Sequence, residues 1–122
     1  MSPRILVVED QEDNRQILRD LFTSASYEMI EALSGDEGVA MAETHRPDLI
    51  LMDIQLPGID GYEATRRIRA NPELSHIPII AVTSYALSGD AGKAREAGCT
   101  GYITKPFSPR QLLATVRSLL EK

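Results

Sequence analysis

Only one cysteine, Cys99, is present among the 122 residues of the chain. A single cysteine cannot form a disulfide within the chain, and this scarcity is typical of proteins that work in a reducing compartment. The simplest interpretation of Cys99 is a small, buried core residue, because free cysteines behave mainly as small hydrophobic side chains. We therefore predict a cytoplasmic protein whose fold does not depend on disulfide bonds.

Long hydrophobic runs and an excess of positive charge are also absent. No apolar run approaches the roughly 20 residues that span a bilayer, and the N-terminus lacks the features of a secretory signal. The 13 Lys and Arg residues are outnumbered by 18 Asp and Glu residues, which gives a net charge of −5. Surfaces that bind nucleic acids or anionic membranes are normally basic. We therefore expect neither a nucleic acid nor a membrane among the partners.

Internal repeats, low-complexity stretches and Ser-, Gly- or Pro-rich linkers are missing as well. We expect residues 1–122 to form one domain, because a chain of this length suits a single hydrophobic core. What the chain does contain is an alternation of short apolar runs and helical patterns. The runs at 5–8, 49–52 and 79–82 are apolar at every position, as in parallel strands covered by helices on both faces. Weaker strand patterns cover 27–32 and 102–103.

Helix signals occupy the segments between these strands. Ser34 precedes Glu37 by three residues and Ser108 precedes Gln111 by three, so each pair predicts a capping box at a helix start. Asp60 is a third candidate N-cap. In total, five strands alternate with five helices. This order predicts a doubly wound α/β fold with a parallel sheet and right-handed crossovers.

The helix expected at about 87–97 differs from the others. Its apolar face is mostly alanine, so it buries little area. Gly89 and Gly92, if helical, each cost about 1 kcal/mol relative to alanine. We expect this helix, which Gly98 would end, to be weakly held and able to shift. The plainer alternative is a marginal surface helix.

Residues with reactive side chains follow the predicted strands. Glu9 and Asp10 come after the first strand, Asp53 after the third, Thr83 ends the fourth and Lys105 follows the fifth. In a doubly wound sheet, the carboxyl ends of the strands carry the functional site. Three carboxylates at this edge would repel one another, so a cation is required. Each residue alone also has an ordinary interpretation, such as a helix cap, a surface lysine or a strand-ending threonine.

The oxygen-rich set of side chains favours a hard cation, and Mg²⁺ fits best because it accepts few protein ligands and keeps several waters. We expect Asp10 and Asp53 to bind Mg²⁺ directly, and Glu9 to act through water or as a third ligand. The backbone carbonyl of Gln55 is a further candidate ligand.

A carboxylate beside Mg²⁺ and a lysine can accept a phosphoryl group. We predict that Asp53 is the nucleophile and forms an aspartyl phosphate. Lys105 and the metal would neutralise the phosphoryl oxygens, and the Thr83 hydroxyl would donate a hydrogen bond to one of them.

Four motifs carry a resemblance to a known family. They are Ile-Leu-Val-Val-Glu-Asp at 5–10, Leu-Ile-Leu-Met-Asp-Ile-Gln-Leu-Pro-Gly-Ile-Asp-Gly at 49–61, Ile-Ala-Val-Thr at 80–83 and Gly-Tyr-Ile-Thr-Lys-Pro-Phe at 101–107. In this order and spacing the whole chain resembles the receiver domains of bacterial two-component response regulators. The stretch at 98–102, together with the absence of an output domain, is similar to single-domain regulators of cell division and polarity.

The resemblance implies a flavodoxin-like sheet with strand order 2-1-3-4-5. It implies that a histidine kinase or a histidine phosphotransfer protein phosphorylates Asp53. It also implies that Glu9 and Asp10 help to hold Mg²⁺, that Lys105 contacts the phosphoryl group, and that the bond from Lys105 to Pro106 is cis.

A switch pair, Thr83 and Tyr102, is also implied by the resemblance; the alternative for Tyr102 is a half-buried strand aromatic. We expect the fourth helix, fifth strand and fifth helix to form the output face toward a downstream protein effector. We expect the kinase to dock around 14–18 and 56–61. The chain would be a monomer that could dimerise on phosphorylation through helices four and five.

Some positions depart from the family pattern or vary within it. Ser84 stands where the family usually has alanine, and Gln55 and Tyr85 occupy positions that tune the lifetime of the phosphoryl group. Tyr85 could shield the phosphoryl bond from water, which suggests slow loss of phosphate.

Three rival functions remain open at this point. An aspartyl-phosphate phosphatase would need a second acid two residues after the nucleophile, where this chain has Gln55. A flavin-binding module would need a phosphate-binding loop after strand one, where the acidic residues 9–13 would repel phosphate. The third rival is a docking platform that does not use phosphate. We therefore expect no turnover of a separate substrate.

Overall fold

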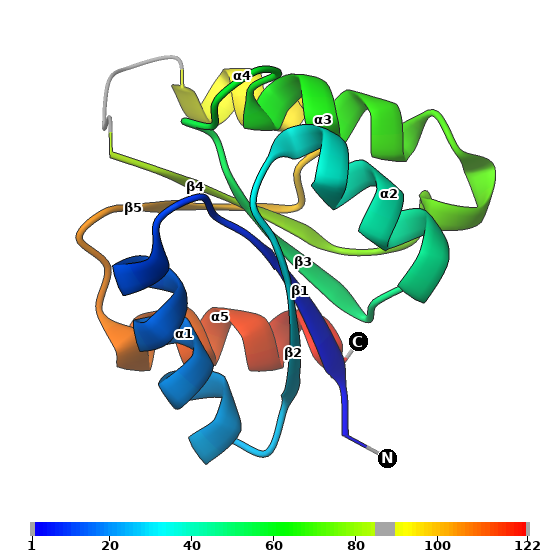
Figure 1. The fold of residues 1–122 in the computed structure, drawn as a ribbon. Helices are drawn as coiled ribbons and strands as arrows, with labels where there is room; N and C mark the ends of the chain where they lie inside the picture. The colour runs from blue at the N-terminus through cyan, green and yellow to red at the C-terminus, as the bar shows by residue number, and fades with distance from the viewer. Residues whose placement is uncertain (1, 85–89, 122) are drawn as a thin grey trace.

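The computed structural model describes residues 2–84 and 90–121. Five parallel strands form one sheet in the order β2-β1-β3-β4-β5, which confirms the predicted fold and strand order (Figure 1). The strands are β1 (Arg4–Val8), β2 (Glu28–Ala32), β3 (Leu49–Asp53), β4 (Ile79–Thr83) and β5 (Gly101–Thr104).

Helices cover both faces of this sheet. They are α1 (Glu12–Ser24), α2 (Gly35–His45), α3 (Gly61–Arg69), α4 (Asp90–Ala97) and α5 (Pro109–Leu120), with a 3₁₀ turn, η1, at Pro72–Leu74. Helices α1 and α5 lie on one face, and α2, α3 and α4 lie on the other (Figure 1). Among the described residues, no helix is long and apolar enough to cross a membrane.

The predicted helix starts are confirmed by their caps. The side chains of Ser34, Asp60 and Ser108 each accept a hydrogen bond from the main-chain N–H three residues later. The capping box at Ser34 differs in one detail, because the Glu37 carboxylate accepts from the N–H of Leu33 rather than from that of Ser34.

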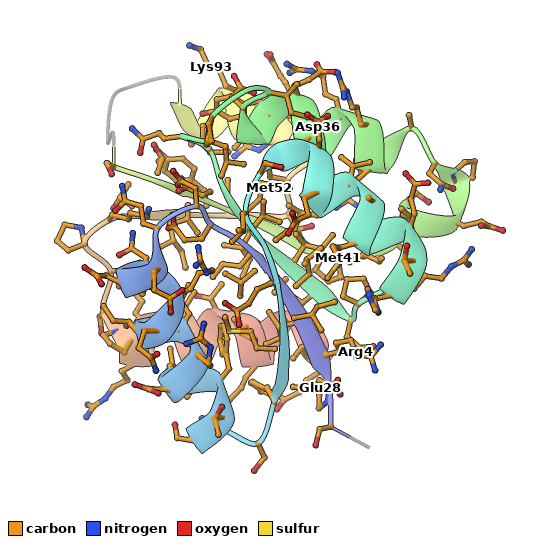
Figure 2. The ribbon with its side chains drawn as sticks, in the orientation of Figure 1. Arg4, Glu28, Asp36, Met41, Met52 and Lys93 are labelled. Carbon is orange, nitrogen blue, oxygen red and sulfur yellow. The ribbon has the colours of Figure 1, made fainter. Side chains whose placement is uncertain are left out.

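Alternate residues of the strands point to opposite faces, so each face has its own core. Toward α1 and α5 the buried set is Ile5, Val7, Leu49, Leu51, Ile80 and Val82, packed with Leu18, Phe22, Leu112 and Val116. Toward α2 and α3 the set includes Leu6, Val8, Ile50 and Met52, packed with Ala42, Ala64 and Ile68. Figure 2 shows Met52 in the interior near the middle of the sheet, whereas the Arg4–Glu28 pair lies at the start of β1 and β2, near the N-terminus. Burial on both faces explains why the sequences of the inner strands β1, β3 and β4 do not alternate with polar residues.

Helix α4 buries only small side chains in the described part of the chain. Ala94 and Ala97 are buried, and Lys93 points away from the molecule (Figure 2). Gly92 lies within the helix, and an added Cβ would meet nothing within 4 Å. The expected start near residue 87 and Gly89 lie outside the described residues, as does Tyr85.

Cys99 corrects one prediction, because its side chain is half-buried rather than buried. It lies between α4 and β5, with its Sγ 3.8 Å from the Thr65 hydroxyl. Burial raises the pKa of the thiol above its ordinary value, so the side chain stays protonated at neutral pH.

Candidate functional site

The carboxyl edge of the sheet brings together side chains from four strand ends. Asp53 and Thr83 are the last residues of β3 and β4, and Glu9 and Lys105 directly follow β1 and β5. Parallel pairing places these ends at the same edge, with Asp53 beside Val82 in the register of β3 and β4. The structure therefore converges on the group of residues that the sequence predicted.

Lys105 connects two of the carboxylates. Its Nζ donates to Glu9 Oε1 at 2.9 Å and lies 3.3 Å from Asp53 Oδ2. Its side chain is only 20% exposed, so both interactions are shielded from water. The Lys105–Pro106 peptide bond is cis, as the family resemblance implied.

Oxygen atoms from Glu9, Asp10 and Asp53 all lie within 4.8 Å of one another. Glu9 and Asp53 are 3% and 4% exposed, whereas Asp10 is exposed to solvent. Such a cluster of hard oxygen donors, open on one side, fits a Mg²⁺ ion that keeps part of its water shell. The residues present therefore suit the predicted metal.

The Asp53 carboxylate is held from two sides. The main-chain N–H of Gln55 donates to Oδ1 at 3.0 Å, and Lys105 donates to Oδ2. The Oε1 atom of the Gln55 side chain accepts from the N–H of Ser84 at 3.0 Å. The role of the Gln55 carbonyl as a metal ligand stays a prediction.

Burial raises the pKa of Asp53 to about 6, and the nearby Glu9 carboxylate adds to this rise against the opposing effects of the Gln55 N–H and Lys105. Burial also opposes ionisation of Glu9. However, hydrogen bonds from Lys105 and from the Gln11 N–H hold the pKa of Glu9 below its ordinary value. Burial likewise disfavours the charged form of Lys105, but the two carboxylates outweigh it and raise the pKa of the lysine. Lys105 and the Gln11 N–H thus stabilise the charged form of Glu9 more strongly than that of Asp53, and Asp53 is the carboxylate that most needs a further cation.

Asn14 also contacts the acidic cluster, although the sequence predicted it only as part of a docking surface. Its Nδ2 donates to Glu9 Oε1 at 3.2 Å, from the first turns of α1. A spacing of five residues across a loop and a helix start is not a recognisable pattern. Only the folded loop shows this contact.

Thr83 and Tyr102 lie on the neighbouring strands β4 and β5, and Thr83 ends β4 at the edge that carries the acidic cluster. Thr83 is 1% exposed, and Tyr102 is partly buried against Ile54, Ala81 and Ala94. In the register of β4 and β5, Tyr102 pairs with Ala81, two residues before Thr83 on the same strand. Their arrangement is compatible with a switch pair, whose movement stays a prediction.

A family model of the response regulator receiver domain matches residues 5–117. The chain belongs to this family. The receiver domain is also 45% identical over 120 residues to the polar-differentiation response regulator DivK of Brucella ovis, and the match covers 98% of each chain.

Two solved receiver structures have the same architecture. One is the receiver domain of the sensor histidine kinase PA1611 of Pseudomonas aeruginosa, with 37% identity, a TM-score of 0.92 and full coverage of both chains. That structure has a magnesium ion coordinated in its active site cleft. The other is the chemotaxis protein CheY4 of Vibrio cholerae, with 28% identity, a TM-score of 0.92 and coverage of 98% and 99%.

Proposed function

We propose that this receiver domain is a single-domain response regulator that accepts a phosphoryl group on Asp53 and signals to a protein partner. The observation that carries the proposal is the position of the Asp53 carboxylate. It lies within reach of Lys105 and beside the oxygens of Glu9 and Asp10. The donor would be a histidine kinase or a histidine phosphotransfer protein.

Each site residue has a separate role in the proposed transfer. An Asp53 oxygen forms the new bond to phosphorus as the bond from phosphorus to the donor imidazole nitrogen breaks. The Gln55 N–H and Lys105 keep the carboxylate oriented, and Lys105 is placed to neutralise phosphoryl oxygens. Glu9, Asp10 and Asp53 would hold Mg²⁺, which when bound supplies positive charge to the phosphoryl group.

The signal would then leave through the face formed by α4, β5 and α5. The Thr83 hydroxyl would donate to a phosphoryl oxygen, and Tyr102 would move inward. Helix α4 suits this role because Ala94 and Ala97 anchor it with little buried area. The receiver would work as a cytoplasmic monomer that could dimerise through α4 and α5 when phosphorylated. It would turn over no separate substrate.

The phosphodonor protein would dock beside α1. An open groove of about 520 Å³ lies there next to Lys105, and Ile17 on its wall is 53% exposed. The remaining lining residues are Asn14, Ser84, Pro106, Phe107 and Pro109. The predicted docking segment 14–18 contributes Asn14 and Ile17 to this groove, and docking at 56–61 stays a prediction.

Intact-mass measurement after incubation with a small-molecule phosphodonor tests the proposal. Wild type and Asp53→Asn are compared, each with Mg²⁺ and with EDTA. We expect one phosphoryl adduct, in wild type with Mg²⁺ only. A folded wild-type protein that forms no adduct under any condition would instead indicate a docking platform that does not use phosphate.

A further inference from the structure

Arg15, near the start of α1, carries a charged side chain that is only 11% exposed. Its guanidinium donates to acceptors on three separate segments. It reaches the main-chain carbonyl of Glu9 at 3.0 Å, Oε1 of Glu31 on β2 at 3.1 Å, and the carboxylate of Glu12 on its own helix. Arg15 thus joins the loop after β1 to the neighbouring strand.

The carbonyl that Arg15 holds belongs to the peptide bond between Glu9 and Asp10. On the other side of Glu9, its N–H donates to the carbonyl of Ala32 at 3.0 Å, and the chain then leaves the sheet. Asp10 is exposed, and across residues 2–84 and 90–121 no hydrogen bond or ion pair to its carboxylate is found. Other groups hold the Glu9 carboxylate, and the contact from Arg15 restrains the peptide that joins Glu9 to Asp10.

The Glu31 carboxylate, on the opposite side of Arg15, is also held by a second arginine. Glu31 accepts from Arg15 and, through both of its oxygens, from Arg19, at 2.7 and 3.1 Å. A planar guanidinium held in this way presents its remaining N–H groups in fixed directions, which a lysine ammonium cannot do.

We propose that Arg15 is a positioning residue for the metal site: by holding the Glu9 carbonyl, it orients Glu9 and Asp10 for a divalent cation. This inference rests on the proposed function, because it assumes that the acidic pair binds Mg²⁺. Residues behind the ligands of a metal site commonly change metal affinity by 10- to 100-fold.

Two conservative substitutions separate positioning from general stability. Arg15→Lys keeps the charge but cannot reach the Glu9 carbonyl and Glu31 together. Arg19→Lys is the matched control, since it also removes a guanidinium from Glu31 and keeps the charge, but Arg19 does not contact Glu9. Both variants are measured as full-length protein.

Mg²⁺ affinity by isothermal titration calorimetry is the first readout. The rate of Asp53 phosphorylation against Mg²⁺ concentration is the second. We expect Arg15→Lys to raise the dissociation constant by about 10-fold or more, and Arg19→Lys to leave it within about 3-fold of wild type. At saturating Mg²⁺, the phosphorylation rate of Arg15→Lys should return close to that of wild type. If Arg15 had only a structural role, Arg15→Lys would lower stability toward urea without changing the Mg²⁺ dissociation constant.

Suppose that wild type binds Mg²⁺ and is phosphorylated. Equal Mg²⁺ dissociation constants for wild type, Arg15→Lys and Arg19→Lys would then overturn this inference but not the proposed function. A wild-type protein that does neither would overturn the proposed function and the inference with it. If Arg15→Lys does not fold, Arg15→Gln replaces it, because its shorter side chain cannot span the Glu9 carbonyl and Glu31 either. An unchanged Mg²⁺ dissociation constant in folded Arg15→Gln would then count against the inference.

Discussion

Asp53 and Glu9 are both buried carboxylates at the same edge of the sheet, but their surroundings differ. Glu9 receives hydrogen bonds from Lys105, Asn14 and the Gln11 N–H. Asp53 receives the Gln55 N–H and a longer contact from Lys105. Lys105 therefore stabilises the negative charge of Glu9 more strongly than that of Asp53. Asp53, which is proposed to accept the phosphoryl group, is left with the less compensated charge.

This difference predicts how stability depends on pH without metal. The pKa of Asp53 is raised from 3.8 to about 6, so the folded state binds its proton more tightly than the unfolded state does. Asp53 therefore adds on the order of 2–3 kcal/mol to the free energy of unfolding below about pH 4, and this contribution is lost as the pH rises through about 6. Asp53→Asn removes the penalty, so we expect it to be more stable than wild type at pH 7.5, with the gap closing toward pH 4.

Urea denaturation in EDTA across this pH range measures the effect. Asp20→Asn, an exposed position on α1, is the control and should show no such gap. A gap that does not change with pH, or an Asp53→Asn protein less stable than wild type at pH 7.5, would contradict the electrostatic interpretation.

At the scale of elements, Arg69 holds the C-terminal end of α4. The Arg69 side chain of α3 donates to the carbonyl of Gly98 at 2.8 Å and to those of Leu74 and Ser75 at 3.2 Å. A cation at the carbonyl end of a helix is favourable because the helix dipole is negative there. Arg69 thus ties α3, η1 and α4 together at one point, about which α4 could pivot.

Two glycines of this region should respond to alanine with opposite signs. Gly92→Ala places a methyl group in open space within the helix, so we expect a gain of about 1 kcal/mol and slower amide exchange in α4. Gly98 has φ +109°, and an added Cβ would lie 2.6 Å from Arg69 Cγ. We expect Gly98→Ala to lower the free energy of unfolding by about 1 kcal/mol or more.

Urea denaturation and amide exchange of both variants beside wild type test this pair of predictions. The two substitutions add the same methyl group, so they control for each other. Equal changes in the free energy of unfolding for Gly92→Ala and Gly98→Ala would contradict the difference in packing between these two positions.

At the scale of the whole molecule, the metal should link the site to global stability. A ligand that binds only the folded state stabilises it by about 2.7 kcal/mol at 100 times its dissociation constant. We expect Mg²⁺ to raise the melting temperature, and to do so more at pH 7.5 than at pH 5, because protonated Asp53 competes with the ion. Asp10→Asn should weaken the effect.

Thermal unfolding at increasing Mg²⁺ concentration, with NaCl of equal ionic strength as the control, measures this linkage. A rise in melting temperature that NaCl reproduces would reflect screening of the net charge of −5 rather than a specific site. A Mg²⁺ effect of the same size at both pH values would contradict the role of Asp53.

Local features of the sequence determined much of this architecture. The continuously apolar strands, the caps at Ser34, Asp60 and Ser108, and the alternation of strands and helices depend on neighbours within a few residues. Such preferences act before tertiary packing, so they are readable in the chain. The reactive residues at the strand ends could also be predicted, because the carboxyl ends of parallel strands lie at one edge of the sheet.

Tertiary structure alone decided which of these residues contact one another. Lys105 donates to Glu9 across 96 positions of sequence. Arg15 reaches the Glu9 carbonyl, and the Gln55 side chain reaches Ser84 rather than the acidic cluster. These contacts depend on strand order, loop shape and the burial of charge, which are properties of distant segments packed together. Burial acts to raise the pKa of both Asp53 and Glu9, and the hydrogen bonds that Glu9 receives from Lys105 and the Gln11 N–H separate the two values.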